Sequence, residues 1–256
     1  MANARDLAGR TIVVTGASSG IGARFGEVLA ARGARVALAA RRLDRLEALT
    51  DTIKANGGEA MAVEMDVTDE ASVIAAFDAV DEQFGRIDTV IANAGRDAKG
   101  SCLELTLEEF DSVMAVNLRG VFLTAREGAR RMVTHLDPKA RRGRIVLISS
   151  ITSQMATPGL SAYSASKAAV NRMGKVMAKE LARAGINLNM LLPGYIETDL
   201  TADSFQTESG KMFLASFPRR RLVEVEELDG LICYLCSDAS SAVTGAEFTV
   251  DEGQSV

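Results

Sequence analysis

Residues 11–22 read TIVVTGASSGIG, and this stretch decides the fold that we expect for the chain. Its first five residues are mostly β-branched, which predicts a short buried strand. A glycine-rich turn follows at once, and the pattern then becomes helical from Ala23 to Arg32, where Gly33 ends it. Glycines let the backbone approach a pyrophosphate, and the free N–H groups of a helix N-terminus attract its charge. A strand, a glycine loop and a helix in this order predict a dinucleotide-binding fold.

The composition limits the class of protein. The chain has 256 residues, a net charge of -5, 47% hydrophobic and 25% charged residues, as in an ordinary soluble globular domain. No basic face is evident, so nucleic acid is not an expected partner, and no apolar run is long enough to span a bilayer. The first residues, MANARD, lack the apolar centre of a signal peptide. Three cysteines give no even disulfide framework, so we expect a cytoplasmic protein.

Strand-like and helix-like segments alternate along the rest of the chain. Short apolar runs predict strands at 35–40, 60–65, 89–92, 144–148, 186–192 and 247–250, and amphipathic runs predict helices at 43–56, 70–84, 107–131, 161–183 and 222–236. Strands that alternate with helices pair in parallel through right-handed crossovers. We therefore expect one α/β domain over residues 1–256. It would be a Rossmann-type, doubly wound parallel sheet of about seven strands with helices on both faces.

The end of the second predicted strand bears on the choice of cofactor. In dinucleotide-binding folds, an acidic residue at this place holds the adenosine ribose hydroxyls and selects NAD. This chain has Arg41 and Arg42 there instead, and guanidinium groups can bind a 2′-phosphate in bidentate fashion. We therefore expect NADP(H) to be preferred over NAD(H). The alternative is that the two arginines only begin the exposed helix that follows.

Tyr163 and Lys167 stand four residues apart in the helix predicted at 161–183. Side chains at i and i+4 share a helix face, so the ammonium group can lie near the phenol and lower the pKa of Tyr163. A tyrosine with such a pKa can give a proton to a carbonyl oxygen or take one from an alcohol. Ser150 would bring a hydroxyl from the end of the preceding strand. An isolated pair of this kind would be an ordinary solvated face, and only the glycine loop makes it significant.

Further short motifs follow the glycine loop in a fixed order. Together the set comprises TGASSGIG at 15–22, DV at 66–67, NAG at 93–95, Asn117, Ser150, Tyr163-x3-Lys167 and PGYIET at 193–198. In their order and spacing the motifs resemble those of the classical short-chain dehydrogenases/reductases, and the resemblance extends from about Leu7 to Gly253. It implies an oxidoreductase that transfers a hydride between NADP(H) and a small-molecule ketone or secondary alcohol. It also implies a homo-oligomer, either a tetramer or a dimer.

The resemblance implies a role for each matching position. Tyr163 is the general acid/base, Lys167 lowers its pKa and holds the nicotinamide ribose, and Ser150 hydrogen-bonds the substrate oxygen. Asn117 steadies a water molecule that relays protons to Lys167. The implied cofactor-binding residues are Gly16, Ser18, Ser19, Gly20, Ile21, Arg41, Arg42, Asp66, Val67, Asn93, Ala94, Gly95, Tyr163, Lys167, Pro193, Gly194, Ile196 and Thr198.

The substrate follows least directly from the sequence. Residues 199–221 lack a clean periodicity, and we expect them to form a segment that closes over the substrate. The residues expected to face the substrate are Arg96, Ile151, Met155, Tyr195, Leu200, Phe205, Met212 and Phe213. This mostly apolar set suits a medium-sized or bulky ketone, whereas Arg96 could instead bind a carboxylate or phosphate. The fold does not choose among these substrates.

Two other functions stay open at this point. The basic run KARRGR at 139–144, which we expect to be exposed, could meet an acidic carrier protein or acyl-CoA phosphates in a 3-oxoacyl-thioester reductase. A cofactor-binding protein without turnover is the third hypothesis, although the intact set of Asn117, Ser150, Tyr163 and Lys167 argues against it. The chain holds a single histidine, so no ordinary zinc set is expected. Cys233 and Cys236 are expected to pack in the core.

Overall fold

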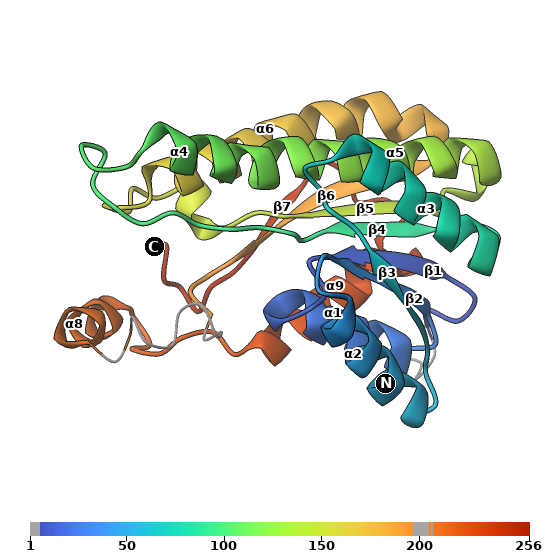
Figure 1. Ribbon diagram of the computed structural model, residues 1–256, viewed down its shortest axis with the longest axis horizontal. Coiled ribbons are helices and arrows are strands. Elements are labelled where there is room, and N and C mark those ends of the chain that lie inside the picture. Colours follow the sequence, from blue (N-terminus) through green and yellow to red (C-terminus); the bar gives the residue numbers. More distant parts are fainter. Residues whose placement is uncertain (1–5, 197–204, 206) are drawn as a thin grey trace.

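The computed structural model describes residues 6–196, 205 and 207–256. Within these residues a parallel sheet of seven strands forms in the order β3-β2-β1-β4-β5-β6-β7 (Figure 1). The strands are β1 (Thr11–Thr15), β2 (Arg35–Ala40), β3 (Glu59–Glu64), β4 (Thr89–Ala92), β5 (Gly143–Ile148), β6 (Ile186–Pro193) and β7 (Glu247–Val250). The strand order reverses between β1 and β4, and such a switch point is where doubly wound sheets bind ligands. The predicted fold class is confirmed.

Two layers of helices cover the two faces of the sheet (Figure 1). One layer holds α3 (Glu70–Phe84), α4 (Leu107–Met114), α5 (Val121–His135) and α6 (Ser161–Leu181). The other holds α1 (Gly20–Ala31), α2 (Leu43–Ala55) and α9 (Asp229–Cys236), while α8 (Glu208–Ser216) lies apart from both layers. In the described part of the chain, no helix has the length and apolar character needed to cross a membrane.

Each face of the sheet has its own apolar core, because neighbouring residues of a strand point to opposite faces. In β1, Val13 packs into the core beneath α3, α5 and α6, whereas Ile12 and Val14 pack into the core beneath α1, α2 and α9. Strands covered on both faces are apolar along their whole length. The continuous apolar runs that predicted these strands are therefore core, and Cys233 and Cys236 are buried in the second of the two cores.

The helix predicted at 107–131 is divided in two by a π-helical turn. Thr106 starts α4 with a capping box, in which the Glu109 N–H donates to Thr106 Oγ1 at 3.2 Å and the Thr106 N–H donates to the Glu109 carboxylate at 2.9 Å. A π-helix over Ala115–Gly120 then joins α4 to α5 and contains Asn117. Single π-helical turns of this kind occur frequently at functional sites.

The C-terminal helices differ from the predicted ones. The helix expected at 222–236 starts later, because Val225–Leu228 forms a 3-10 turn and α9 begins only at Asp229. The segment expected to be irregular contains α8, where the hydroxyl of the N-cap residue Thr207 accepts the Gly210 N–H at 3.0 Å. This helix is only 9 residues long, too short for its periodicity to stand out from the flanking sequence.

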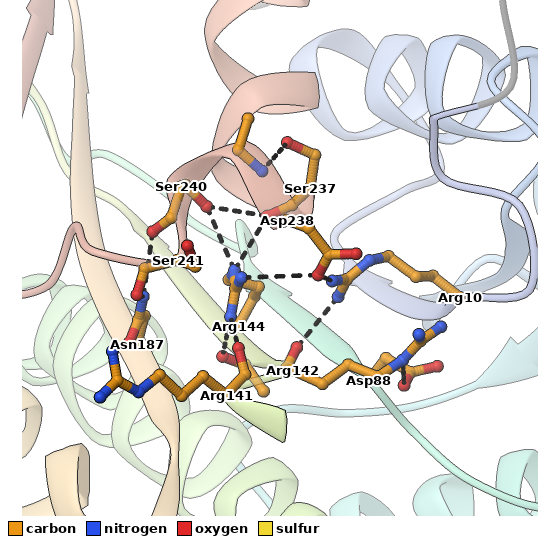
Figure 2. A network of polar contacts seen from close by, with 12 residues as sticks. Arg10, Asp88, Arg141, Arg142, Arg144, Asn187, Ser237, Asp238, Ser240 and Ser241 are labelled. Carbon is orange, nitrogen blue, oxygen red and sulfur yellow. Dashed lines mark hydrogen bonds and ion pairs between the residues drawn. The ribbon is translucent and has the colours of Figure 1, made fainter. Parts of the chain in front are cut away.

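A buried polar network joins β1 and β5 to the residues after α9 (Figure 2). Arg10 and Arg144 are each only 1% exposed, and both face the carboxylate of Asp238. Arg144 also donates to the carbonyl oxygens of Gly143 and Ser237, at 2.9 and 3.1 Å. Burial and the neighbouring charge of Arg10 lower the pKa of Arg144 to about 10. Asp238 is therefore the counter-charge that allows two guanidinium groups to be buried side by side.

The same network corrects the expectation of an exposed basic surface at residues 139–144. Arg142 Nε donates to Asp88 at 2.6 Å, and the Arg142 carbonyl accepts from Arg10 at 2.9 Å. Arg144 is buried. The prediction is therefore wrong for Arg144, and Arg142 is half-buried through its bond to Asp88. Only Lys139 and Arg141 of the basic residues in this run are exposed.

Asp238→Ala should destabilise the fold, because it leaves Arg10 and Arg144 buried without their counter-charge. The Asp238 side chain is 74% exposed, so solvent screens the pairs and we expect a loss of about 1 kcal/mol, well below that of a fully buried pair. Urea denaturation followed by circular dichroism measures it. Asp51→Ala, on the exposed side of α2, is the matched control. Equal denaturation midpoints for the two variants would contradict this account of the network.

Candidate active site

The glycine loop lies where β1 passes into α1. Gly16 has a φ of 67°, and a Cβ on it would lie 2.8 Å from the Cα of Ala94. A Cβ on Gly22 would lie 2.5 Å from both the Gly16 carbonyl oxygen and Asn93 Nδ2. Helix α1 begins after Ser19 without a side-chain cap, so its first N–H groups stay available to an anion. A close-packed glycine backbone and a free helix N-terminus fit the pyrophosphate of a dinucleotide.

Thr15 and Asn93 hold the ends of β1 and β4 together at the switch point. Asn93 Nδ2 donates to the Thr15 carbonyl at 2.9 Å. The N–H groups of Asn93 and Ala94 donate in turn to Thr15 Oγ1, at 3.0 and 3.1 Å. These bonds bring the NAG motif, ending at Gly95, beside the glycine loop. The sequence places Thr15 both in the strand and at the start of the TGASSGIG motif, and a hydroxyl in a largely apolar strand is the signal that could have assigned it this positioning role.

Arg42 lies against the glycine loop. Its guanidinium group donates to Ser18 Oγ at 2.7 and 3.1 Å and to Ser19 Oγ at 2.9 Å. Arg41 lies near Asp66: hydrogen bonds from Thr68 lower the pKa of the Asp66 carboxyl, and the charge of Arg41 lowers it further. Both arginines follow the end of β2, where a doubly wound sheet holds an adenosine ribose.

Val67 and Gly120 bring the end of β3 against the π-helix. A Cβ on Gly120 would lie 2.8 Å from Val67 Cγ2. At the end of β6, the Gly194 N–H donates to Val250 at 2.9 Å, and Ile196 forms a parallel bridge with Val223. The predicted cofactor residues that fall within the described chain therefore lie at or after the ends of β1, β2, β3, β4 and β6, except Tyr163 and Lys167, which lie on α6. Thr198 lies outside the described residues.

The four predicted catalytic residues converge from three elements: Asn117, Ser150, Tyr163 and Lys167. Lys167 is 3% exposed, its Nζ donates to the Ile148 carbonyl at 2.8 Å, and it lies 5.5 Å from the centre of the Tyr163 ring. A Cβ on Gly95 would lie 3.7 Å from Lys167 Nζ and 3.6 Å from Asn117 Oδ1. The NAG motif therefore adjoins the catalytic group.

The side-chain amide of Asn117 hydrogen-bonds two other segments of the chain. Its Oδ1 accepts the Arg96 N–H at 2.9 Å, and its Nδ2 donates to the Arg96 carbonyl at 2.9 Å and to Ser166 Oγ at 3.1 Å. Ser166 Oγ donates in turn to the Tyr163 carbonyl at 2.6 Å. One buried side chain thus ties the π-helix to both the NAG motif and the first turn of α6. The water-steadying role implied for Asn117 stays a prediction.

Burial moves the pKa values of the two central groups in opposite directions. It raises the pKa of Tyr163 to about 12, against the lowering effect of a hydrogen bond with Ser150, and the charge of Asp97 raises it further. Burial also lowers the pKa of Lys167 to about 8. The expectation that Lys167 lowers the pKa of Tyr163 is therefore wrong when these two side chains are considered without a cofactor. The Lys167 ammonium group is bonded to Ile148, and the loss of solvation outweighs any attraction.

Aromatic side chains cluster around Tyr195, which follows β6. The Tyr195 ring makes edge contacts with Phe213 and Phe205, at centroid distances of 5.1 and 6.1 Å, and stacks on Phe217 at 5.6 Å. Its hydroxyl donates to Thr157 Oγ1 at 3.4 Å, and burial raises the pKa of its phenol. The cluster connects α8 and its flanks to the end of the sheet.

Not every residue predicted to face the substrate has that position. Ile151 is 1% exposed and belongs to the buried interior, because the 3-10 turn after β5 directs it inward. Met212 is 75% exposed on α8, outside the aromatic cluster. Arg96 is exposed and Met155 is half-buried. Leu200 lies outside the described residues. The described part of the chain contains no group of three or more His, Cys, Asp or Glu side chains that could hold a metal ion.

Comparison with known proteins agrees with this geometry. A family model described as short chain dehydrogenase matches residues 10–209. Gluconate 5-dehydrogenase of Gluconobacter oxydans is 37% identical over 98% of this chain and 96% of its own. The 3-oxoacyl-acyl-carrier-protein reductase FabG of Escherichia coli is 34% identical over 96% and 97%. A Burkholderia cenocepacia short chain dehydrogenase solved in complex with NADP superposes with a TM-score of 0.89 and 30% identity, covering 98% and 100% of the two chains.

The chain therefore belongs to the short-chain dehydrogenase/reductase family, which makes it an oxidoreductase. The resemblance drawn from the sequence motifs is confirmed at this level.

Lys167→Met should change how stability depends on pH. Lys167 has a pKa of about 8 in the folded protein, against 10.5 for an unperturbed lysine. Between these values the unfolded chain binds more protons than the folded one, so wild-type stability rises with pH. At a pH below the folded-state pKa of Lys167, its buried positive charge disfavours folding, so the Lys167→Met variant should be more stable than the wild-type protein. Its advantage should shrink by on the order of 2 kcal/mol between about pH 7.5 and 9.5.

Denaturant titrations of both proteins at the two pH values measure this difference. Lys179→Met, on the exposed side of the same helix, is the control and should differ from wild type equally at both pH values. An advantage for Lys167→Met that stays constant with pH would show that Lys167 is not buried as a weakened base.

Proposed function

We propose that the protein transfers a hydride between NADP(H) and a ketone or secondary alcohol, with Tyr163 as the general acid/base. The observation that carries the proposal is the convergence of Tyr163, Ser150 and Lys167 beside Gly95, at the switch point of the sheet. A glycine cradle and a free helix N-terminus lie at the same edge. This arrangement supports a dinucleotide at the sheet edge with its reactive end toward Tyr163.

The protein's part in the reaction follows from its proton donors. A bound nicotinamide supplies the hydride chemistry. Ser150 and Tyr163 would hydrogen-bond the substrate carbonyl oxygen, and Tyr163 would protonate the alkoxide as it forms. A phenol with a pKa of about 12 is protonated at neutral pH, as reduction requires. In the oxidation direction Tyr163 must lose its proton, which the positive charge of the oxidised cofactor would favour; a pKa-lowering effect of Lys167 stays a prediction for the cofactor-bound protein.

Arg42 supports the preference for NADP(H). Its guanidinium group is held over the glycine loop by Ser18 and Ser19, and no acidic residue occupies the end of β2. A cation fixed at the adenosine ribose suits a 2′-phosphate. Arg41 would add a second positive charge from the side of Asp66. The NADP bound in the Burkholderia cenocepacia structure is consistent with this preference in a similar protein.

The aromatic cluster supports a bulky, largely apolar ketone as the substrate. Tyr195, which influences the pKa of Tyr163, packs with Phe205, Phe213 and Phe217 in an apolar cluster, and aromatic side chains commonly line small-molecule sites. We further propose that the described part of the expected lid segment, residues 207–221, closes over this substrate; residues 199–204 and 206 of that segment lie outside the described residues. Arg96, exposed next to the NAG motif, would suit a carboxylate-bearing substrate, and the similarity to a gluconate 5-dehydrogenase favours that variant of the proposal.

A 3-oxoacyl-thioester reductase is the second candidate, favoured by the similarity to FabG of Escherichia coli. The burial of Arg144 and the bonding of Arg142 to Asp88 weaken its electrostatic support. Lys139 and Arg141 are what remain exposed for an acidic carrier. A binding protein without turnover is least supported, since it has no need of four converging catalytic groups.

The cellular setting and assembly are also proposals. Exposed apolar side chains lie on the helices of one layer: Leu107 and Phe110 on α4, Phe122 and Val133 on α5, and Val176 on α6. Such residues suit a homo-oligomeric contact, in a tetramer or else a dimer. We place the protein in the cytoplasm, with no nucleic acid or membrane partner.

Tyr163→Phe tests the proposed chemistry. The variant should lose turnover by about 10²- to 10⁴-fold, because the proton donor is gone, while NADPH binding measured by fluorescence survives. Tyr234→Phe changes a half-buried tyrosine of α9 that packs against the core and serves as the control. If the Tyr163→Phe variant kept its turnover, Tyr163 would not be the general acid/base.

Arg42→Ala tests the cofactor preference. The variant should raise the KM for NADPH by about ten- to a hundredfold, the value of a charge-assisted hydrogen bond, and leave the KM for NADH unchanged. Arg45→Ala, on the exposed part of α2, should change neither. If Arg41→Ala produced the larger effect instead, the assignment to Arg42 would be wrong.

A further inference from the structure

Ser150 receives two hydrogen bonds from a neighbour to which no role has been given. The backbone N–H of Thr152 donates to Ser150 Oγ at 3.2 Å, and Thr152 Oγ1 lies at 3.1 Å from the same oxygen. Both residues are buried, with exposures of 8% for Ser150 and 3% for Thr152. A serine hydroxyl offers one proton and two lone pairs. If Thr152 fills both lone pairs, Ser150 can act only as a donor, and its proton points away from Thr152.

We propose that Thr152 is a positioning residue, whose hydroxyl directs the single Ser150 O–H to the side of Tyr163, where it donates to the phenol oxygen in the free enzyme and to the substrate oxygen once substrate is bound. The inference rests on the proposed function, because it assigns a direction to a hydrogen bond in that reaction. Thr152 itself would touch neither substrate nor cofactor. It would act by keeping Ser150 from rotating away from the reacting oxygen.

The backbone of Ser150 is held separately, which isolates the role of Thr152. Ser153 Oγ donates to the Ser150 carbonyl at 2.6 Å, and Asn171 Nδ2 donates to Ser153 Oγ at 2.9 Å. Asn171 stands four residues after Lys167 on α6, so the helix face that carries the catalytic pair also holds this turn. With the backbone fixed, the rotation of the Ser150 hydroxyl is the freedom that remains, and Thr152 is the side chain that restricts it.

The direction of this hydrogen bond affects Tyr163. A Ser150 hydroxyl that donates to the phenol oxygen stabilises the phenolate, and this bond lowers the pKa of Tyr163. Catalysis gains from donors that are oriented before the reaction. Loss of the Thr152 hydroxyl would leave Ser150 free to turn, so fewer molecules would present the donor at any moment. The phenolate would then form less readily.

Thr152→Val tests the proposal, because valine keeps the shape of threonine and removes only the hydroxyl. We expect kcat to fall by about five- to twentyfold, less than for removal of a direct donor, with the KM for the cofactor unchanged. In the alcohol-oxidation direction, the acidic limb of the pH profile should move to higher pH. Thr152→Ser keeps the hydroxyl, so its kcat and the position of the acidic limb of its pH profile should match those of the wild-type protein. A merely structural role would not move the limb.

A double-mutant cycle shows whether Thr152 acts through Ser150. In a Ser150→Ala background, Thr152→Val should cause no further loss of the residual rate. An equal loss in both backgrounds, or a Thr152→Val enzyme with wild-type kcat and pH limb, would overturn the inference and leave the proposed function standing. Absence of turnover in the wild-type protein with every ketone and alcohol tested would overturn the proposed function, and the inference with it.

Discussion

The carboxyl ends of the parallel strands meet at one edge of the sheet, and the candidate site depends on this constraint. Crossovers of a single hand bring each strand back in the same direction, so the residues that follow β1, β4, β5 and β6 become neighbours. Thr15 and Asn93 join the first two of these ends with hydrogen bonds at the switch point. Residues far apart in the sequence are thereby brought together at one edge of the sheet.

Burial then gives the side chains at this edge their chemical character. Lys167 and Tyr163 both lose solvation, which favours the neutral amine and the neutral phenol. Hydrogen bonds oppose that trend at defined atoms, from Ser150 to the phenol and from Lys167 to Ile148. At the other end of β1 and β5, Arg10 and Arg144 are also buried. There the lost solvation is offset by ion pairs with Asp238 and by hydrogen bonds to carbonyl groups.

Local patterns were enough to predict the strands, most helices and the family, because apolar runs and glycine turns are set by neighbouring residues. Long-range partners were not predictable in this way. The basic run at 139–144 looked exposed, yet Asp88 and Asp238, distant in sequence, draw two of its arginines inward. The pKa of Tyr163 was expected to fall because a charge four residues away is visible in sequence, whereas the desolvation that raises it is not. The π-helix and the Thr152 contact likewise depend on packing rather than on composition.

The most direct measurement is the oxidation of NADPH and NADH by the wild-type protein, followed by absorbance, across a panel of free ketones and one 3-oxoacyl thioester. The account predicts turnover of a bulky free ketone with NADPH strongly preferred. Turnover of the thioester alone would favour the second candidate function. Preference for NADH would contradict the role given to Arg42. Tight cofactor binding without turnover in either direction would contradict the central claim that this edge of the sheet is an oxidoreductase active site.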